Sequence, residues 1–154
     1  MAISGVTSQV QAAKKPVQAP LKGNIRHSVS KWCFGDYELD EFCKICTRIG
    51  IGSVELLDPK EWPIVQQNGL TVAMAQGAGL GIDRAFNDPS LHDELVKSYE
   101  EIIPQVAAAG LTNLICFAGK RNGVTDLQGW ENCEKGLKRI VPIAEKHNVV
   151  LTME

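Results

Sequence analysis

Residues 109–118, Ala-Gly-Leu-Thr-Asn-Leu-Ile-Cys-Phe-Ala, hold the two signals that decide the fold: a glycine that closes a helix and an apolar run directly after it. Gly and Asn are favoured just past a helix end because the closing residue adopts a left-handed conformation. The same junction occurs three more times, at Gly50, Gly69 and Asn148. A short, almost wholly apolar run follows each junction, which is typical of parallel strands covered on both faces. These predicted strands are residues 53–57, 71–75, 113–118 and 149–154.

The segments between these predicted strands have apolar residues at helical spacing, which predicts amphipathic helices. Residues 39–49 place their apolar side chains on one face, and Asp88-Pro89 starts the longest helix with a capping residue and a first-turn proline. The last helix has an apolar stripe of its own. We predict burial for Leu39, Phe42, Cys43, Cys46 and Ile49 in the first helix, and for Trp130, Cys133, Leu137, Ile140, Val141 and Ala144 in the last.

Strands and helices alternate strictly along the chain. Residues 24–34 predict a less apolar opening strand, so we expect five strands and four helices, an α/β protein of parallel β/α repeats. Two architectures fit this order. One is an open, doubly wound sheet, and the other is the first four units plus the fifth strand of a TIM (β/α)8 barrel, formed by residues 23–154. A complete barrel of this kind takes about 250 residues.

Composition narrows the class of protein. A net charge of −2 gives no general attraction for nucleic acid or for an anionic membrane. The apolar stretches are shorter than the roughly 20 residues that a membrane span requires. Five cysteines cannot all pair, and a reducing cytoplasm is the simplest location. Residues 1–22 are polar and aperiodic, and we predict a flexible N-terminal arm; a remnant left by a removed export signal is the alternative.

Two short motifs have simple structural explanations. Cys43-Lys-Ile-Cys46 lies inside the first helix on its apolar face, which favours packing over a redox pair. In Gln76-Gly-Ala-Gly-Leu-Gly81 the glycines do not match the dinucleotide-binding spacing, and no helix begins directly behind them. We expect a pliable loop at the mouth of the sheet, where bare backbone can approach a small ligand.

Several side chains fall at the carboxyl ends of the predicted strands, the edge where β/α proteins collect catalytic groups. Glu55 lies in an apolar strand and needs a partner, either in a structural pair or in a site. Glu154 ends the last strand, and a surface acid is its alternative interpretation. Lys120 and Arg121 suit a substrate carboxylate or phosphate, unless they are solvated rim charges. Trp32 after the first strand and His92 in the first turn of the long helix complete the substrate-binding candidates.

The order of these segments resembles the hydroxypyruvate isomerase-like branch of the xylose isomerase-like barrel superfamily. The resemblance runs from about Asn24 to Glu154. It rests on Ser53-Val-Glu-Leu-Leu-Asp-Pro59, Leu70-Thr-Val-Ala-Met-Ala75, Asn87-Asp-Pro-Ser-Leu-His-Asp-Glu-Leu95, Asn113-Leu-Ile-Cys-Phe-Ala-Gly119 and Val150-Leu-Thr-Met-Glu154.

The resemblance implies a divalent-metal-dependent aldose–ketose isomerase acting on hydroxypyruvate or a sugar. In that family the fifth-strand glutamate is a metal ligand and a catalytic acid/base, which implies both roles for Glu154, with Mg²⁺ or Mn²⁺ in preference to Zn²⁺. A dry barrel mouth would raise the pKa of such a glutamate. The family's other ligands come from its sixth to eighth strands, so we expect this sequence to stop inside an active site. The alternative is a non-catalytic half-barrel that is stable as an oligomer, self-associating through its open sheet edge.

Overall fold

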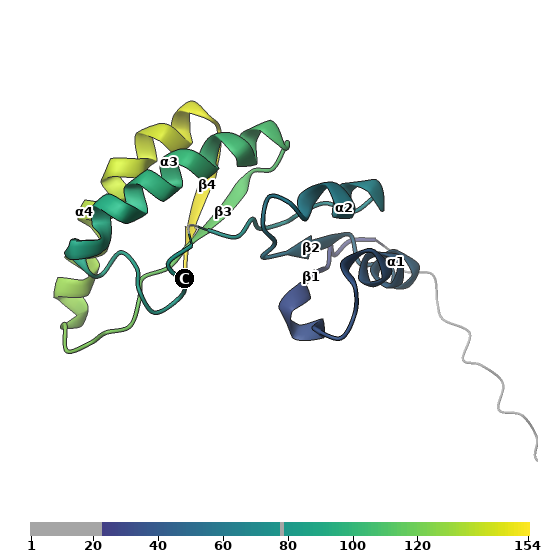
Figure 1. The fold of residues 1–154 in the computed structure, drawn as a ribbon, viewed down its shortest axis with the longest axis horizontal. Coiled ribbons are helices and arrows are strands. Elements are labelled where there is room, and N and C mark those ends of the chain that lie inside the picture. Colours follow the sequence, from purple (N-terminus) through teal and green to yellow (C-terminus); the bar gives the residue numbers. More distant parts are fainter. Residues whose placement is uncertain (1–22, 78) are drawn as a thin grey trace, which may run out of the picture.

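The computed structural model describes residues 23–77 and 79–154; the predicted arm at 1–22 lies outside the described residues. Strands and helices alternate along most of the chain (Figure 1). The elements are β1 (Ser28–Ser30), the 3-10 turn η1 (Lys31–Phe34), α1 (Leu39–Ile49), β2 (Ser53–Glu55), α2 (Trp62–Gln67), the 3-10 turn η2 (Pro89–Leu91), α3 (His92–Ala108), β3 (Asn113–Cys116), α4 (Asp126–Lys146) and β4 (Val150–Met153).

All recorded strand pairings are parallel, as predicted. β1 pairs with β2, and β3 pairs with β4. Residues 71–75 link the two pairs through isolated bridges, from Thr71 to β2 and from Ala75 to both Leu57 and Leu114. The spatial order is therefore β1, β2, residues 71–75, β3, β4.

The continuous strand predicted over 71–75 is wrong: the segment forms isolated bridges at Thr71 and Ala75. Between them the Asn113 side-chain amide donates to the Ala73 carbonyl at 2.8 Å, so a side chain takes the place of a strand N–H there. The first strand is also shorter than predicted. It ends at Ser30, where the chain turns into η1.

The four α-helices pack on one face of the sheet, which we call the helix face. The main hydrophobic core joins side chains from all four helices to Val54, Leu114 and Cys116 of the strands. Figure 1 shows α3 and α4 lying together along β3 and β4, and these two helices contact each other. A doubly wound sheet has helices on both faces, so this arrangement agrees with the barrel alternative and not with the doubly wound one.

Side-chain alternation defines the opposite surface, which we call the open face. Successive strand residues point to opposite sides. Leu114 and Cys116 belong to the main core, whereas Ile115 and Phe117 form a second, smaller cluster with Ala85. Leu56 and Met74 pack against this second cluster. The open face therefore has an apolar centre of its own on β3.

Three residues of the predicted helix stripes are exposed. Ile49 is 59% exposed, Trp130 is 67% exposed and Val141 is 37% exposed. Phe42, Cys43, Cys46, Cys133, Ile140 and Ala144 are buried as predicted. The exposed residues belong to α1 and α4, the helices that pack beside the outermost strands. Among the described residues no strand lies beyond β1 or β4. The part of the apolar face of α1 and of α4 that extends past these outermost strands is therefore exposed to solvent.

The predicted helix-closing residues are confirmed. Gly50, Gly69, Gly110 and Asn148 all have positive φ angles, between 55° and 85°. Asp88 also caps as predicted, although it caps η2, which precedes α3: its carboxylate accepts a hydrogen bond from the Ser90 N–H at 3.0 Å.

The packing interpretation of Cys43 and Cys46 is confirmed. Their side chains are buried in the main core. Burial raises the pKa of both thiols, that of Cys43 to about 11, which is opposite to the lowered pKa of a redox-active cysteine. All five cysteines are free thiols. None of the helices in the described part of the chain is long and apolar enough to cross a membrane.

Candidate active site at the carboxyl edge of the sheet

Parallel strands bring their carboxyl ends to one edge of the sheet, and two of the predicted site residues, Glu55 and Glu154, stand at that edge. Glu55 ends β2, and Glu154 follows β4 directly. Val54 belongs to the helix-face core and Leu151 packs against it, so alternation places Glu55 and Glu154 together on the open face.

Glu55 has the partner that an acid in an apolar strand requires. The Ser28 hydroxyl donates a hydrogen bond to Glu55 Oε1 at 2.5 Å. The β1–β2 register, which sets Ser30 opposite Glu55, brings the two side chains to the same face. The prediction that Glu55 is partnered is therefore confirmed. The partner itself lies 27 residues away in the sequence, and its identity depends on strand register.

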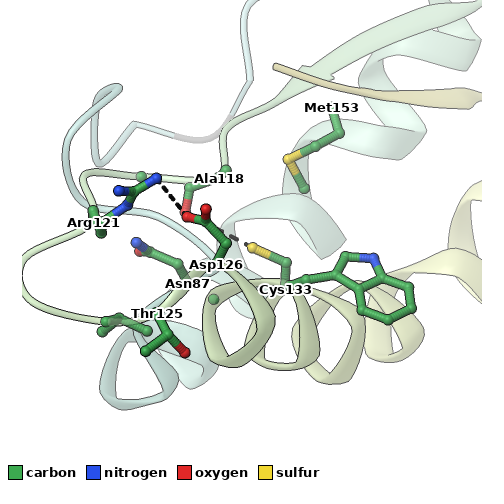
Figure 2. Close-up of a pocket in the computed structure, with 11 residues that line it drawn as sticks. Asn87, Ala118, Arg121, Thr125, Asp126, Cys133 and Met153 are labelled. Carbon is green, nitrogen blue, oxygen red and sulfur yellow. Dashed lines mark hydrogen bonds and ion pairs between the residues drawn. The ribbon is translucent and has the colours of Figure 1, made fainter.

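Glu154 continues the β3–β4 ladder beyond the end of β4. Its N–H donates to the Cys116 carbonyl at 2.9 Å, and its carbonyl accepts from the Ala118 N–H at 2.9 Å. The neighbouring Met153 points to the helix face, where it lies near α4 (Figure 2). Glu154 therefore points to the open face, as a barrel-lining residue would. The predicted dry surroundings are wrong for the described residues, because Glu154 is exposed.

A metal site needs more ligands than this edge brings together. Within residues 23–77 and 79–154, no three His, Cys, Asp or Glu side chains are grouped closely enough to hold one ion. Mg²⁺ demands near-octahedral oxygen coordination, and Glu154 supplies a single carboxylate side chain. The described residues do not fit a complete Mg²⁺ or Mn²⁺ site.

The two predicted rim cations are paired with nearby carboxylates. Lys120 Nζ lies 2.6 Å from Asp83 Oδ2, and Arg121 Nη2 lies 2.5 Å from Asp126 Oδ1. All four side chains are exposed, so the pairs contribute little to stability. Each pair uses only part of the donor set of its exposed cation, so an anionic ligand would share these cations with Asp83 and Asp126 or displace them.

Trp32 and His92 occupy very different environments. Trp32 lies in η1 and is 73% exposed. His92 is buried, and its Nε2–H donates to the Phe86 carbonyl at 2.8 Å. Its ring also lies against Gly136 of α4. This placement gives His92 a packing role between α3 and α4, which its position in the first turn of a helix did not reveal.

The glycine loop after residues 71–75 begins with a packing requirement. A Cβ atom built on Gly77 would lie 2.1 Å from the Ile115 carbonyl oxygen and 2.7 Å from the Tyr99 hydroxyl oxygen. The bare backbone at Gly77 therefore approaches the protein's own strand β3. This packing gives a structural reason for the glycine at position 77, and ligand approach by the loop at 76–81 stays a prediction.

A cavity of about 460 Å³ lies on the helix face, between the β3–α4 loop, the first turns of α4 and the end of β4 (Figure 2). Arg121 and Asp126 form their ion pair at its edge, and Met153 and Cys133 line it. Because Met153 points into this cavity and Glu154 points to the open face, the cavity is not part of the site around Glu154. Sequence patterns did not indicate it.

Asn87 is a further rim residue that the sequence reasoning missed. Its amide donates to the Lys120 carbonyl at 2.5 Å, and its own carbonyl accepts from the Asn132 side chain at 2.9 Å. The Asn87 N–H donates to the Ala118 carbonyl at 2.8 Å. Asn87 thus fastens the loop before α3 to the end of β3 and to α4. The asparagine directly before Asp88-Pro89 is the one sequence signal that could have suggested it.

The sequence matches no protein-family model and no curated protein. Solved structures do match. An AP endonuclease, family 2, from Brucella melitensis gives a TM-score of 0.69 at 14% identity, covering 83% of this chain and 54% of its own. A sugar phosphate isomerase/epimerase from Parabacteroides distasonis gives 0.67 at 8% identity, covering 91% and 55%. D-Psicose 3-epimerase from Clostridium cellulolyticum, solved with D-tagatose, gives 0.63 at 11% identity, covering 82% and 51%.

A xylose isomerase domain-containing protein from Salmonella typhimurium is also among the matches. These likenesses show that the chain has an α/β fold with parallel strands like that of the matching structures. The chain spans about half the length of each of these four solved structures.

Proposed function

We propose that the chain forms the first four β/α units and the fifth strand of a xylose isomerase-like barrel, and that it serves a sugar isomerase or epimerase reaction. The observation that supports this most directly is the position of Glu154, on the open face and at the carboxyl edge of a parallel sheet whose helices all lie on the other face. Catalytic groups of β/α barrels come from the carboxyl ends of the strands. Most of the matching structures named above are described as isomerases or epimerases, or contain a xylose isomerase domain.

In this proposal Glu154 moves a proton. Aldose–ketose interconversion and epimerisation beside a carbonyl both remove a proton from a carbon and return one through an enediolate. A carboxylate within hydrogen-bonding reach of that proton is a suitable general base. The N–H and the carbonyl of Glu154 both bond the neighbouring segment, at Cys116 and Ala118, which sets its side chain on the open face.

We propose Mg²⁺ or Mn²⁺, in preference to Zn²⁺, as the cofactor of this reaction, with Glu154 as one ligand. Such an ion stabilises a developing oxyanion. The remaining ligands would have to come from outside the described residues, so no step is assigned to the ion. We propose Lys120 as the contact for an anionic substrate group; Arg121, at the edge of the helix-face cavity, and Trp32 and His92 stay untested predictions for substrate binding. We propose a reducing cytoplasm as the location, because five cysteines cannot form a fully paired disulfide framework.

Solvent exchange tests the proposed reaction. The chain is incubated in D₂O with Mg²⁺ or Mn²⁺ and, separately, with hydroxypyruvate, D-fructose, D-allulose and D-tagatose. We expect loss of the proton signal beside the carbonyl, followed by ¹H NMR, faster than in a sample without protein for at least one compound. Exchange that stays at the protein-free rate for all four compounds contradicts an isomerase or epimerase activity of this chain.

A second candidate function, a structural half-barrel that associates with itself, is favoured by the exposed edge of β4. In a parallel ladder successive residues direct their backbone groups to alternate sides. The Val150 and Glu154 N–H groups point to β3, so those of Leu151 and Met153 point to the open edge. Val150 is 57% exposed, and the strand contains no Lys or Pro, the residues that usually protect an edge.

A charge on this edge should weaken the association. We expect the unmodified chain to form dimers or larger species in sedimentation velocity, and Val150→Lys to shift it toward monomer because a lysine at the edge opposes strand pairing. Lys146→Arg, an exposed change on α4 that preserves the charge, is the control. A monomeric unmodified chain at high concentration argues against this function.

A further inference from the structure

We infer that Asn87 is a positioning residue that determines specificity: it holds Lys120 at the carboxyl edge of the sheet, so that the site prefers substrates with a carboxylate or phosphate group. The inference rests on the proposed function, and it specifies the substrate class for the same site. Asn87 is buried, and it does not have to touch the ligand. It acts through the backbone of the segment that carries Lys120.

Asn87 holds the rim segment first through its own backbone. Its N–H donates to the Ala118 carbonyl at 2.8 Å, and the Ala118 N–H donates to the Glu154 carbonyl at 2.9 Å. Ala118 is therefore bonded to Asn87 on one side and to the proposed acid/base on the other. The Asn132 side chain of α4 donates to the Asn87 carbonyl at 2.9 Å. Asn132 is also buried, so this anchor of Asn87 is shielded from water.

The Asn87 side chain fixes the turn that follows Ala118. Its amide donates to the Lys120 carbonyl at 2.5 Å. Gly119 lies between the two bonded residues with a φ of 102°, and a Cβ atom built on it would collide with Asn87 Oδ1. The turn is thus packed against the Asn87 side chain, and a residue without a Cβ atom is required there. Loss of this side chain would free the backbone on both sides of Gly119.

Lys120 is held from a second direction by Asp83. The Lys120 N–H donates to the Asp83 carbonyl at 3.1 Å, and Lys120 Nζ lies 2.6 Å from Asp83 Oδ2. With the bond from Asn87, both backbone polar groups of Lys120 and its ammonium group have partners. The side chain is still 65% exposed, and an ammonium group has three donors. A restrained cation loses less freedom on binding an anion than a mobile one, which favours affinity.

The same contacts place Lys120 close to the face on which Glu154 acts. Ala85 belongs to the smaller apolar cluster on the open face, and Asp83 is two residues before it in the same segment. Lys120 follows Ala118, the ladder partner of Glu154, by two residues. Two residues span at most about 7 Å and one inter-strand step about 4.8 Å. The long side chains of Lys120 and Glu154 shorten this separation, so one small substrate can contact both.

Binding measurements on the full chain test this inference. Hydroxypyruvate and D-fructose 6-phosphate, which are anions, and D-fructose, which is neutral, are titrated by isothermal calorimetry into the unmodified chain and its variants. Asn87→Ala removes the donor to the Lys120 carbonyl, and Lys120→Met removes the cation. Asn24→Ala, the same change at an exposed position before β1, is the matched control. Circular dichroism melting confirms that each variant is folded. Gly119→Ala, which disturbs the same turn, replaces Asn87→Ala if that variant does not fold.

We expect Asn87→Ala to weaken binding of at least one anion about fivefold or more, and Lys120→Met to weaken it at least as much. Any binding of D-fructose should change by less than about twofold in both variants, and Asn24→Ala should bind like the unmodified chain. Amide hydrogen exchange should accelerate at Lys120 in Asn87→Ala and stay unchanged at Ile115, whose N–H bonds the Ala75 carbonyl in the sheet.

Three results would overturn the inference: no anion binding by the unmodified chain, anion binding that survives Asn87→Ala or Lys120→Met, and equal losses for the anions and D-fructose. The last result would mean that Asn87 only supports the fold. Anion binding that depends on Asn87 and Lys120 without any solvent exchange would contradict the proposed reaction and leave the role of Asn87 in binding intact.

Discussion

Glu154→Gln should abolish most solvent exchange by this chain. The substitution keeps the size and hydrogen-bonding shape of the side chain but removes the group that accepts a proton, and general acid–base catalysis typically contributes about 10²–10⁴-fold. The backbone of residue 154 stays in the ladder through Cys116 and Ala118, so the fold should not change. The measurement is the initial rate of deuterium incorporation into the best substrate of the four-compound panel.

The controls separate proton transfer from binding. Glu100→Gln, which removes an equivalent charge from the exposed surface of α3, should leave the exchange rate unchanged. Glu55→Gln should raise the substrate concentration needed for half-maximal exchange and leave the maximal rate less affected, because the sequence predicts Glu55 as a substrate-binding residue and not as the acid/base. A Glu154→Gln variant that exchanges at the unmodified rate would remove Glu154 from the reaction, and the carboxyl edge would then lack its acid/base.

The fold could be predicted from the sequence because its signals are local. Each signal, a glycine or asparagine at a helix end followed by an apolar run, lies within about ten residues of sequence. Gly50, Gly110 and Asn148 have the positive φ angles predicted for residues that close a helix. The face on which the helices pack is a tertiary property. The sequence therefore allowed both a doubly wound sheet and a barrel, and only the structure shows that the helices share one core on a single face of the sheet.

The site was predicted less completely because its contacts depend on strand register. Glu55 was singled out as an acid in an apolar strand, yet its partner Ser28 follows from the β1–β2 pairing. His92 looked available near the rim, and its burial against Phe86 and Gly136 depends on how α3 packs on α4. Patterns along the chain identify candidate residues, whereas packing between distant segments determines which of them face a ligand.

That packing is tested most directly at Gly136. A Cβ atom on this residue would lie 2.5 Å from Phe86 Cδ1 and 2.9 Å from His92 Nε2. Both neighbours are buried, and His92 is also held by its hydrogen bond to Phe86, so neither side chain can move aside freely. Overpacking of this kind typically costs about 1–3 kcal/mol. Alanine in place of glycine inside a helix offsets about 1 kcal/mol of that cost, so we expect Gly136→Ala to lower the free energy of unfolding, measured by urea denaturation, by up to about 2 kcal/mol.

Gly129 provides the matched control in the same helix. A Cβ atom there would have its nearest contacts at 3.9 Å, to Asn87 and Val124, which is ordinary packing distance. Alanine is favoured over glycine inside a helix by about 1 kcal/mol, so Gly129→Ala should raise the free energy of unfolding. The two substitutions are chemically identical and seven residues apart in α4, so their opposite signs would isolate the α3–α4 contact. If Gly136→Ala stabilises the chain as Gly129→Ala does, α3 and α4 do not pack closely through Phe86 and His92, and His92 would again be free to face a ligand.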